Sequence, residues 1–243
     1  MIEFDSVSFA FDDVTVLEDV SLTIDDGEFV LLVGANGSGK TTLIRHCNAL
    51  LTPDSGEVLV DGVSAVENPV AARTSVGMVF QHPRDQFVDA FVGADVAFGP
   101  ENLGLPREEI DRRVEAALEA VNLAGYEDER IDALSGGEQA RVAIAGSLAM
   151  EPSHLVLDEP FTGLDEPARQ SVLSRLASLS DGGTGILVAT HDLRDVVALA
   201  DRLVAMEGGR VVAKGTPEAV VDELEELHVR VPDEASKSRV RSE

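Results

Sequence analysis

A glycine-rich segment, Gly34 to Thr41, has the residue types and the spacing of a loop that binds phosphate groups. It reads Gly-Ala-Asn-Gly-Ser-Gly-Lys-Thr and matches the pattern G-x-x-x-x-G-K-[ST]. Glycines let backbone N–H groups converge on phosphate oxygens, and the N-terminus of a following helix adds partial positive charge. We expect Lys40 to reach the β- and γ-phosphates and the Thr41 hydroxyl to ligate Mg²⁺. The segment therefore predicts a site for a nucleoside triphosphate.

Two adjacent carboxylates, Asp158 and Glu159, follow a short apolar run at 155–157. Ligands bind at the carboxyl ends of parallel strands, so both acids should face the phosphate loop if their strands are neighbours. We expect Asp158 to hold Mg²⁺, directly or through water, and Glu159 to polarise the attacking water as a general base. The pair indicates hydrolysis in addition to binding.

A second candidate anion site is the segment Leu134-Ser135-Gly136-Gly137-Glu138-Gln139. Ser135 is a suitable N-cap, and the two glycines expose backbone N–H groups at the positive end of the helix that follows. Taken alone, the segment is also compatible with a plain helix cap and turn.

Strand-like and helical runs alternate along most of the chain. This alternation would place the candidate residues in loops at the ends of strands. The fully apolar run over 29–33 is typical of a strand covered on both faces, and it leads directly into the phosphate loop. Further strands are expected over 2–9, 20–24, 58–60, 76–80, 154–157, 185–190, 203–206 and 210–213, and helices over 41–50, 107–121, 141–149, 167–179, 193–200 and 218–227. The alternation argues for an α/β fold with a parallel, doubly wound sheet and a mainly helical insert.

Charge and composition exclude several classes of protein and of binding site. The chain has 45 acidic and 19 basic residues, a formal net charge of −26, three lysines and one cysteine. Such a surface repels nucleic acid and suits a halophile, because screening lengths fall to about 3 Å in 1 M salt. Cys47 alone cannot form an internal disulfide or a cysteine-based zinc site. No run is long and apolar enough to span a bilayer, and no secretory signal is evident.

The order of the motifs resembles that of the nucleotide-binding subunit of an ABC transporter, over residues 1–215. The phosphate loop, Gln81, LSGGE, Asp158-Glu159, Gly163-Leu164-Asp165 and His191 follow one another in that order. The resemblance implies a P-loop NTPase (RecA-like) parallel sheet with an antiparallel β subdomain over 1–85 and 150–215, and an inserted α-helical subdomain over 86–149. A C-terminal helix and flexible tail would occupy 216–243. The implied cofactors are ATP and Mg²⁺.

The resemblance also implies residue roles. Glu159 and His191 would be catalytic, and Gln81 would sense Mg²⁺ and the γ-phosphate. Phe11 stands where the family usually has a Tyr stacked on adenine, with Val16 beside it. The nucleotide-binding residues implied are Phe11, Val16, Gly34, Ala35, Asn36, Gly37, Ser38, Gly39, Lys40, Thr41, Thr42, Gln81, Ser135, Gly136, Gly137, Glu138 and Asp165, and the metal ligands are Thr41, Gln81 and Asp158.

Two copies facing head-to-tail would explain why the chain has two anion sites. The LSGGE loop of one copy would close over ATP held by the phosphate loop of the other, and Asp165 would lie in the loop that communicates across this dimer. Hydrolysis would then open the pair. The partner copy could be identical or a paralogous ATPase.

The segment after Gln81 is similar to that of the A-component of energy-coupling factor (ECF) importers. The similarity lies in QHPRDQ (81–86), DVAFGPENLG (95–104) and LIRHCNALLT (43–52), although Asn is commoner than His82 in that family. It implies a membrane T-component, a substrate-binding S-component, a peripheral position on the cytoplasmic face of the membrane, and cobalt, nickel or biotin as the solute. Phe87, Val88, Phe91, Val92 and Phe98 would either face the T-component or belong to the core.

Other functions are less consistent with the sequence. An ATPase of another ABC importer or exporter remains an alternative. A soluble ABC ATPase of DNA repair or translation fits less well, because the chain has one cassette, no heptads and an acidic surface. A GTPase is excluded, because none of the three lysines follows an asparagine in an N-K-x-D motif.

Overall fold

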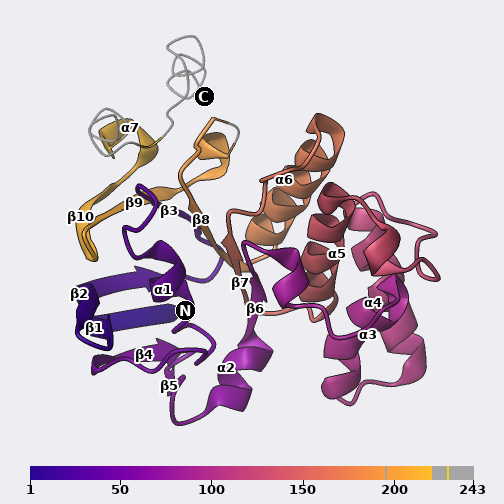
Figure 1. The fold of residues 1–243 in the computed structure, drawn as a ribbon, viewed down its shortest axis with the longest axis horizontal. Coiled ribbons are helices and arrows are strands. Elements are labelled where there is room, and N and C mark those ends of the chain that lie inside the picture. Colours follow the sequence, from indigo (N-terminus) through magenta and orange to yellow (C-terminus); the bar gives the residue numbers. More distant parts are fainter. Residues whose placement is uncertain (195, 221–228, 230–243) are drawn as a thin grey trace.

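The computed structural model describes residues 1–194, 196–220 and 229, which form two β-sheets with helices packed against the larger one (Figure 1). The larger sheet has the strand order β10-β9-β3-β8-β7-β6. Its strands are β3 (Phe29–Val33), β6 (Val76–Val79), β7 (His154–Asp158), β8 (Gly185–Thr190), β9 (Arg202–Glu207) and β10 (Arg210–Gly215). All neighbours pair in parallel except β9 and β10, so the loops after β3, β6, β7 and β8 leave one edge of the sheet.

The smaller sheet is antiparallel, with the order β2-β1-β4-β5. Its strands are β1 (Ile2–Phe11), β2 (Val14–Ile24), β4 (Ser55–Val60) and β5 (Val63–Ser64). In Figure 1 this sheet lies on the side of the molecule opposite the large helices. One face of β1 and β2 is buried and the other is largely exposed, which explains the imperfect alternation of apolar residues in these strands.

Strand β3 is buried along its whole length because its two faces belong to two different cores. Phe29, Leu31 and Val33 pack into the core beneath the large helices. Val30 and Leu32 point the opposite way, into the core shared with the antiparallel sheet. Side chains alternate between the faces of a strand, so a five-residue apolar run is what such a central strand requires.

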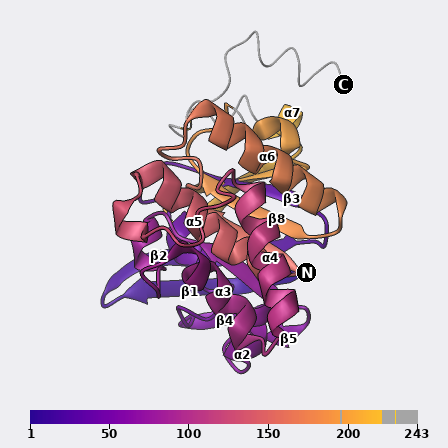
Figure 2. The same cartoon turned by 90° about the vertical axis from the view of Figure 1, so that its right-hand side faces the viewer.

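The larger helices cover one face of the parallel sheet, as the turned view shows (Figure 2). They are α3 (Val92–Asn102), α4 (Arg107–Ala120), α5 (Gly136–Ala149) and α6 (Glu166–Asp181). Helix α4 turns Ile110, Val114, Ala117 and Leu118 inward, in the spacing expected of an amphipathic helix. Three shorter helices are α1 (Lys40–Ile44), α2 (Pro69–Ser75) and α7 (Pro217–Val220).

The expected fold class is confirmed, but several expected helices differ in extent. The helix expected over 41–50 ends at Ile44, where turns begin that bring the N–H groups of Leu50 and Leu51 back to the carbonyl of Arg45. Ala49 takes a positive φ of 53° there, which a continuous helix would not allow. The helix expected over 193–200 is only a 3₁₀ turn at Val197–Leu199.

Three further helix boundaries differ from those expected from the sequence. The helical region expected from about residue 86 starts at Val92, and the helix expected over 141–149 starts at Gly136. Of the helix expected over 218–227, residues 218–220 belong to α7, and 221–227 lie outside the described residues, as does the tail from 230 onward. Within the part of the chain that is described, no helix is long and apolar enough to cross a membrane.

Candidate nucleotide-binding site

The phosphate loop connects β3 to α1 and is held closed by its own lysine. Lys40 Nζ donates hydrogen bonds to the carbonyls of Gly34, at 2.7 Å, and Ala35, at 3.1 Å. Gly34 has a φ of 154°, and a Cβ at this position would lie 2.3 Å from the Met206 carbonyl oxygen. The first glycine of the motif is therefore required by the close approach of β9.

The interior of this loop is polar and poorly solvated. Lys40 is buried, which lowers the pKa of its ammonium, while the carboxylates of Glu159 and Asp158 act in the opposite direction. Ser38 Oγ is also buried and makes no hydrogen bond within the described residues. An anion that binds here would satisfy both the ammonium and the hydroxyl.

Thr41 and Asp158 are brought together from α1 and the end of β7. Thr41 Oγ1 donates a hydrogen bond of 2.7 Å to Asp158 Oδ2. Burial raises the pKa of the Asp158 carboxyl; the Thr41 bond lowers it in part, and nearby Glu159 raises it further. A hydroxyl and a carboxylate oxygen are the hard donors that Mg²⁺ prefers, so the pair fits the metal that the family implies.

Glu159 follows Asp158 at the end of β7 and is fixed to the end of β8. Its backbone takes a φ of 49°, and its N–H donates to the Ala189 carbonyl at 2.8 Å. Its carboxylate accepts hydrogen bonds from the Thr190 hydroxyl and the His191 N–H, both at 3.0 Å, and lies 2.6 Å from His191 Nδ1. The sequence indicates separate roles for Glu159 and His191 but does not predict their contact or the bond from Thr190, whose only signal is its position directly before His191.

Gln81 follows β6, which pairs with β7 in the register Val79 to Leu157. Gln81 and Asp158 therefore leave the same edge of the sheet from neighbouring strands. The Gln81 side chain is exposed. The backbone at Gln81 therefore starts from the strand beside the one that ends in Asp158, and its amide oxygen is of the donor type that Mg²⁺ prefers.

Phe11 and Val16 flank the turn between β1 and β2. Phe11 is 48% exposed and packs edge-on against Phe9, with ring centroids 4.8 Å apart. A Cβ on Gly39 would lie 3.1 Å from the Val16 carbonyl oxygen, so this part of β2 lies directly against the phosphate loop. An exposed aromatic face beside a phosphate loop suits a stacked base.

The LSGGE segment forms the N-terminus of α5 by a reciprocal cap. Ser135 Oγ accepts the Glu138 N–H at 3.3 Å, and the Glu138 carboxylate accepts the Ser135 N–H at 2.8 Å. A Cβ on Gly137 would lie 2.8 Å from the Gly163 carbonyl oxygen, so LSGGE packs against the loop that ends at Asp165. Asp165 itself caps α6 by accepting the Ala168 N–H at 2.9 Å.

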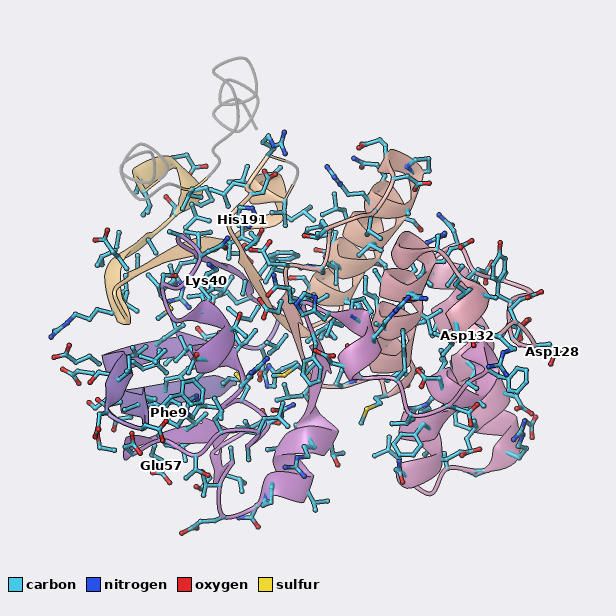
Figure 3. The ribbon with its side chains drawn as sticks, viewed as in Figure 1. Phe9, Lys40, Glu57, Asp128, Asp132 and His191 are labelled. Atoms are coloured by element: carbon cyan, nitrogen blue, oxygen red, sulfur yellow. The ribbon has the colours of Figure 1, made fainter. Side chains whose placement is uncertain are left out.

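The LSGGE segment does not face the phosphate loop of its own chain. In Figure 3, Asp132, three residues before Ser135, lies among the helices on the right, whereas Lys40 and His191 lie left of the centre. The structure thus brings together Lys40, Thr41, Asp158, Glu159 and His191, and leaves the expected residues 135–138 apart from them.

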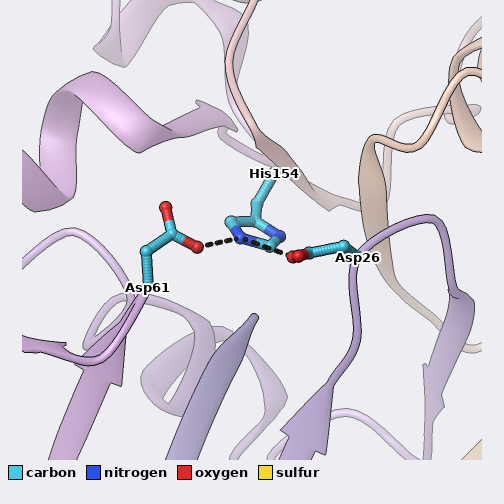
Figure 4. Close-up of side chains that lie close together, drawn as sticks. All are labelled: Asp26, Asp61 and His154. Atoms are coloured by element: carbon cyan, nitrogen blue, oxygen red, sulfur yellow. Dashed lines mark hydrogen bonds and ion pairs between the residues drawn. The ribbon is translucent and has the colours of Figure 1, made fainter.

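A second group of titratable side chains lies at the other end of β7 (Figure 4). His154 Nε2 is 2.9 Å from Asp61 and 3.6 Å from Asp26, and these three residues have ligand atoms within 4.8 Å of one another. The amino group of Met1 also lies among them, 2.8 Å from Asp61. The contact of His154 with Asp61 joins the turn after β4 to the start of β7, away from the phosphate loop.

A phosphate loop after β3, a carboxylate pair at the end of β7, with β8 between these two strands, and a separate LSGGE helix together define an ATP-binding cassette. The family model described as ABC transporter matches residues 17–162. The chain therefore belongs to the ABC transporter ATPase family, and it is an ABC-type ATPase.

Three curated relatives support this assignment. A putative ABC transporter ATP-binding protein of Halobacterium salinarum is 64% identical over 222 residues, 91% of this chain and 96% of that protein. The cobalt import ATP-binding protein CbiO of Syntrophus aciditrophicus is 46% identical over 92% of this chain and 81% of its own length. The energy-coupling factor transporter ATP-binding protein EcfA of Methanothermobacter thermautotrophicus is 42% identical over 89% and 71%.

Among solved structures, the dimeric post-hydrolysis state of an ATP-binding cassette bound to ADP and Pi is similar to this chain. It has a TM-score of 0.81 and 27% sequence identity, and the match covers 89% of this chain and 98% of that one. The ABC ATPase fold is thereby confirmed, and the first relative comes from a halophile, as the charge had indicated.

Proposed function

We propose that this chain is the ATPase component of an ECF-type importer that takes up a metal ion or vitamin, with cobalt, nickel and biotin as the candidates. The support is the similarity to CbiO and EcfA proteins, whose names refer to cobalt import and to energy coupling. The sequence over 81–104 agrees with it. The chain would lie peripherally on the cytoplasmic face of the membrane, bound to a T-component and, through it, to an S-component.

The proposed reaction is hydrolysis of ATP to ADP and phosphate. Lys40 and the backbone N–H groups of the loop would hold the phosphates, with Phe11 against the base and Val16 beside it. The Glu159 carboxylate would take the proton of the attacking water, and His191 would contact the γ-phosphate. Thr190 holds the Glu159 carboxylate in place, because its hydroxyl donates to one oxygen while His191 binds the other.

Mg²⁺ would be held by Thr41 and Asp158, and Gln81 would supply a further oxygen ligand. When bound, the ion neutralises charge on the phosphate oxygens. The buried Asp158 carboxylate is suited to a cation, because burial has already raised its pKa and a positive charge nearby would stabilise its ionised form.

The proposed active unit is a head-to-tail dimer with the same chain or with a paralogue. The single observation that carries it is the separation of the two candidate anion sites: the phosphate loop that contains Lys40 and the capped N-terminus of α5, which follows Asp132 among the helices. We also propose that the two sites belong to separate subdomains, with residues 86–149 as the helical one within a cassette that spans 1–215.

The substitution Ser135→Arg tests this dimer. A bulky cation at the α5 cap should block association, while ATP binding by a single subunit, measured by isothermal titration, stays within about twofold of wild type. Ser174→Arg, on the exposed side of α6, is the matched control and should dimerise normally with ATP. Normal ATP-dependent dimerisation of Ser135→Arg in size-exclusion chromatography would contradict the proposal.

The proposed surface for the T-component includes Val88, Phe91 and Phe98, which are 56%, 45% and 47% exposed. Val92, expected to be either core or partner-facing, is fully buried, and Phe87 is half-buried against the same core. Asp95 holds this surface in shape, because its carboxylate accepts the N–H groups of Val88 and Asp89, at 2.7 and 3.1 Å. Apolar side chains gathered at the surface are typical of an interaction site.

Membrane cofractionation of Val88→Asp in the native host tests the docking surface. We expect the variant to leave the membrane fraction while it retains ATP affinity, and Val70→Asp, on α2 and 77% exposed, to stay membrane-bound as the control. Membrane subunits that copurify with wild type identify the transporter; an importer or exporter outside the ECF type would contradict the proposed subtype.

A further inference from the structure

Three side chains from distant segments converge at the start of β7, at the opposite end of this strand from Asp158 (Figure 4). Asp26 lies in the turn between β2 and β3, Asp61 lies in the turn between β4 and β5, and His154 is the first residue of β7. His154 Nε2 is 2.9 Å from Asp61 Oδ1 and 3.6 Å from Asp26 Oδ1. One imidazole nitrogen and two carboxylate oxygens therefore lie close enough together to bind a single ion.

The imidazole of His154 is fixed with Nε2 toward the two carboxylates. Its side chain is only 1% exposed. Its neighbour on β8 is Gly185, where a Cβ would lie 2.6 Å from His154 Nδ1, so the glycine leaves room for the ring. Nδ1 has no hydrogen-bond partner within the described residues, and the polar contacts of the ring are made by Nε2. A buried imidazole held in this way is a ligand positioned in advance.

The same three atoms already surround a positive charge. The Met1 ammonium lies 2.8 Å from Asp61 Oδ1 and 2.9 Å from His154 Nε2, and it also pairs with Asp26. The arrangement of the donor atoms is therefore that of a cation site. The side chain of Met1 is 47% exposed, so its amino group can leave this position when a metal ion takes it.

The donor set favours a zinc-type ion over Mg²⁺. Zinc binds imidazole nitrogen and carboxylate oxygen at about 2.0–2.2 Å in tetrahedral geometry, which sets neighbouring ligands about 3.3–3.5 Å apart. The distances of 2.9 and 3.6 Å from His154 Nε2 lie on either side of this value. Mg²⁺ prefers an octahedron of oxygen atoms, so a nitrogen ligand disfavours it. A surface pocket of about 680 Å³, lined by Asp26, Asp61 and residues 182–184, gives the ion access from solvent.

We infer that Asp26, Asp61 and His154 form a binding site for a divalent transition-metal ion such as Zn²⁺. This site is separate from the one that Thr41 and Asp158 would provide for Mg²⁺. The bound ion ties the turns after β2 and β4 to the start of β7, so it stabilises the fold. The inference is independent of the proposed function, because it requires neither a nucleotide nor a membrane partner.

Titration of the chelator-treated, nucleotide-free chain with Zn²⁺ alone tests the site. Molar KCl screens the acidic surface, so ions attracted by net charge alone are suppressed. We expect wild type to bind one Zn²⁺ that His154→Gln does not bind, or binds at least about tenfold more weakly, the cost of losing even an outer-shell partner of a metal ligand. Zn²⁺ should also raise the melting temperature of wild type but not that of the variant. His82→Gln, which removes an exposed histidine outside the group, is the matched control and should behave like wild type.

Asp26→Asn keeps the test decisive if substitution of buried His154 prevents folding, because Asp26 is 70% exposed. This variant should fold normally and lose the rise in melting temperature with Zn²⁺. Mg²⁺ at the same concentration should affect wild type and Asp26→Asn equally. Wild-type protein that binds no Zn²⁺, or Asp26→Asn protein that binds it with wild-type affinity, would overturn the site, and neither result would affect the proposed ATPase.

Discussion

His191 Nδ1 lies 2.6 Å from a carboxylate oxygen of Glu159, so the two residues expected to act on the γ-phosphate form one hydrogen-bonded unit. The unit spans two strands, because Glu159 ends β7 and His191 follows β8. The β7–β8 register, which pairs Asp158 with Ala189, brings the strand ends together. The geometry of the pair formed by Glu159 and His191 is therefore set by the sheet.

Substitution of Glu159 by Gln should separate binding from hydrolysis. The amide keeps the shape and can still accept the His191 N–H, but it cannot take a proton, which is worth roughly 10²–10⁴ in rate. The change also removes a negative charge close to the γ-phosphate site, so ATP-bound dimers should accumulate. Size-exclusion chromatography with Mg-ATP and a phosphate-release assay measure the two effects.

Glu207→Gln is the control for this substitution. It removes the same negative charge, but from an exposed residue at the end of β9. It should hydrolyse ATP normally. Wild-type turnover by Glu159→Gln would place the general base at another residue.

Substitution of Lys40 by Ala should abolish ATP binding measured by isothermal titration. In the proposed site the Lys40 ammonium would hold the phosphates, and in the structure it closes the loop through the carbonyls of Gly34 and Ala35. Lys214→Ala, at an exposed position of β10, should leave the affinity unchanged. An unchanged affinity of Lys40→Ala would mean that the phosphates bind elsewhere.

The strands that carry the candidate site were predictable from the sequence because their signals are local. The run over 29–33, the glycines after it and the acids after β7 each follow from backbone geometry over a few residues, and the fold supplies only the pairing of β3, β8 and β7. The sequence predicts a longer helix than α1 because the residues after Ile44 have ordinary helix propensity. In the structure the turn at Ala49 is stabilised by Arg73, which donates hydrogen bonds to the carbonyls of Asn48 and Ala49.

The hydrogen bond of 3.0 Å that Arg84 Nε donates to Gln139 Oε1 on α5 could not be predicted from the sequence. The two residues are 55 positions apart, and neither their types nor their neighbours indicate that they meet. Such pairs depend on how α5 packs on the end of β6, which is a property of the assembled core. The same holds for Thr190, whose role depends on the distance between two strand ends.

Salt should stabilise the protein strongly, because the formal net charge is −26. The Debye length is about 30 Å at 10 mM salt and about 3 Å at 1 M, so self-repulsion acts across the whole molecule only in dilute salt. The melting temperature should rise steadily from 10 mM to molar KCl. Sucrose at matched osmolality is the control for solvent exclusion. A melting temperature that does not change with KCl concentration would contradict the halophilic interpretation.

Acid should weaken the fold through Glu28, which joins the start of β3 to β9. Arg202 donates to both carboxylate oxygens of Glu28, at 2.6 and 2.8 Å. Burial alone would raise the pKa of Glu28, but the Arg202 hydrogen bonds and the Asp25 N–H lower it below the usual value of 4.5. A carboxyl whose pKa is lower in the folded state stabilises the fold above the unfolded pKa and loses that contribution as the pH falls through the folded pKa.

Glu28→Gln should therefore lower the melting temperature at pH 7, and the difference from wild type should shrink as the pH falls below about 4.5. Thermal melts at several pH values in fixed molar KCl measure this difference, since the paired groups are partly buried and less screened than surface charges. Glu57→Gln, at an exposed position of β4 with no ion pair among the described contacts, should show no such pH-dependent difference. A constant difference for Glu28→Gln from pH 7 to pH 3 would mean that its effect comes from packing and not from the ionised pair with Arg202.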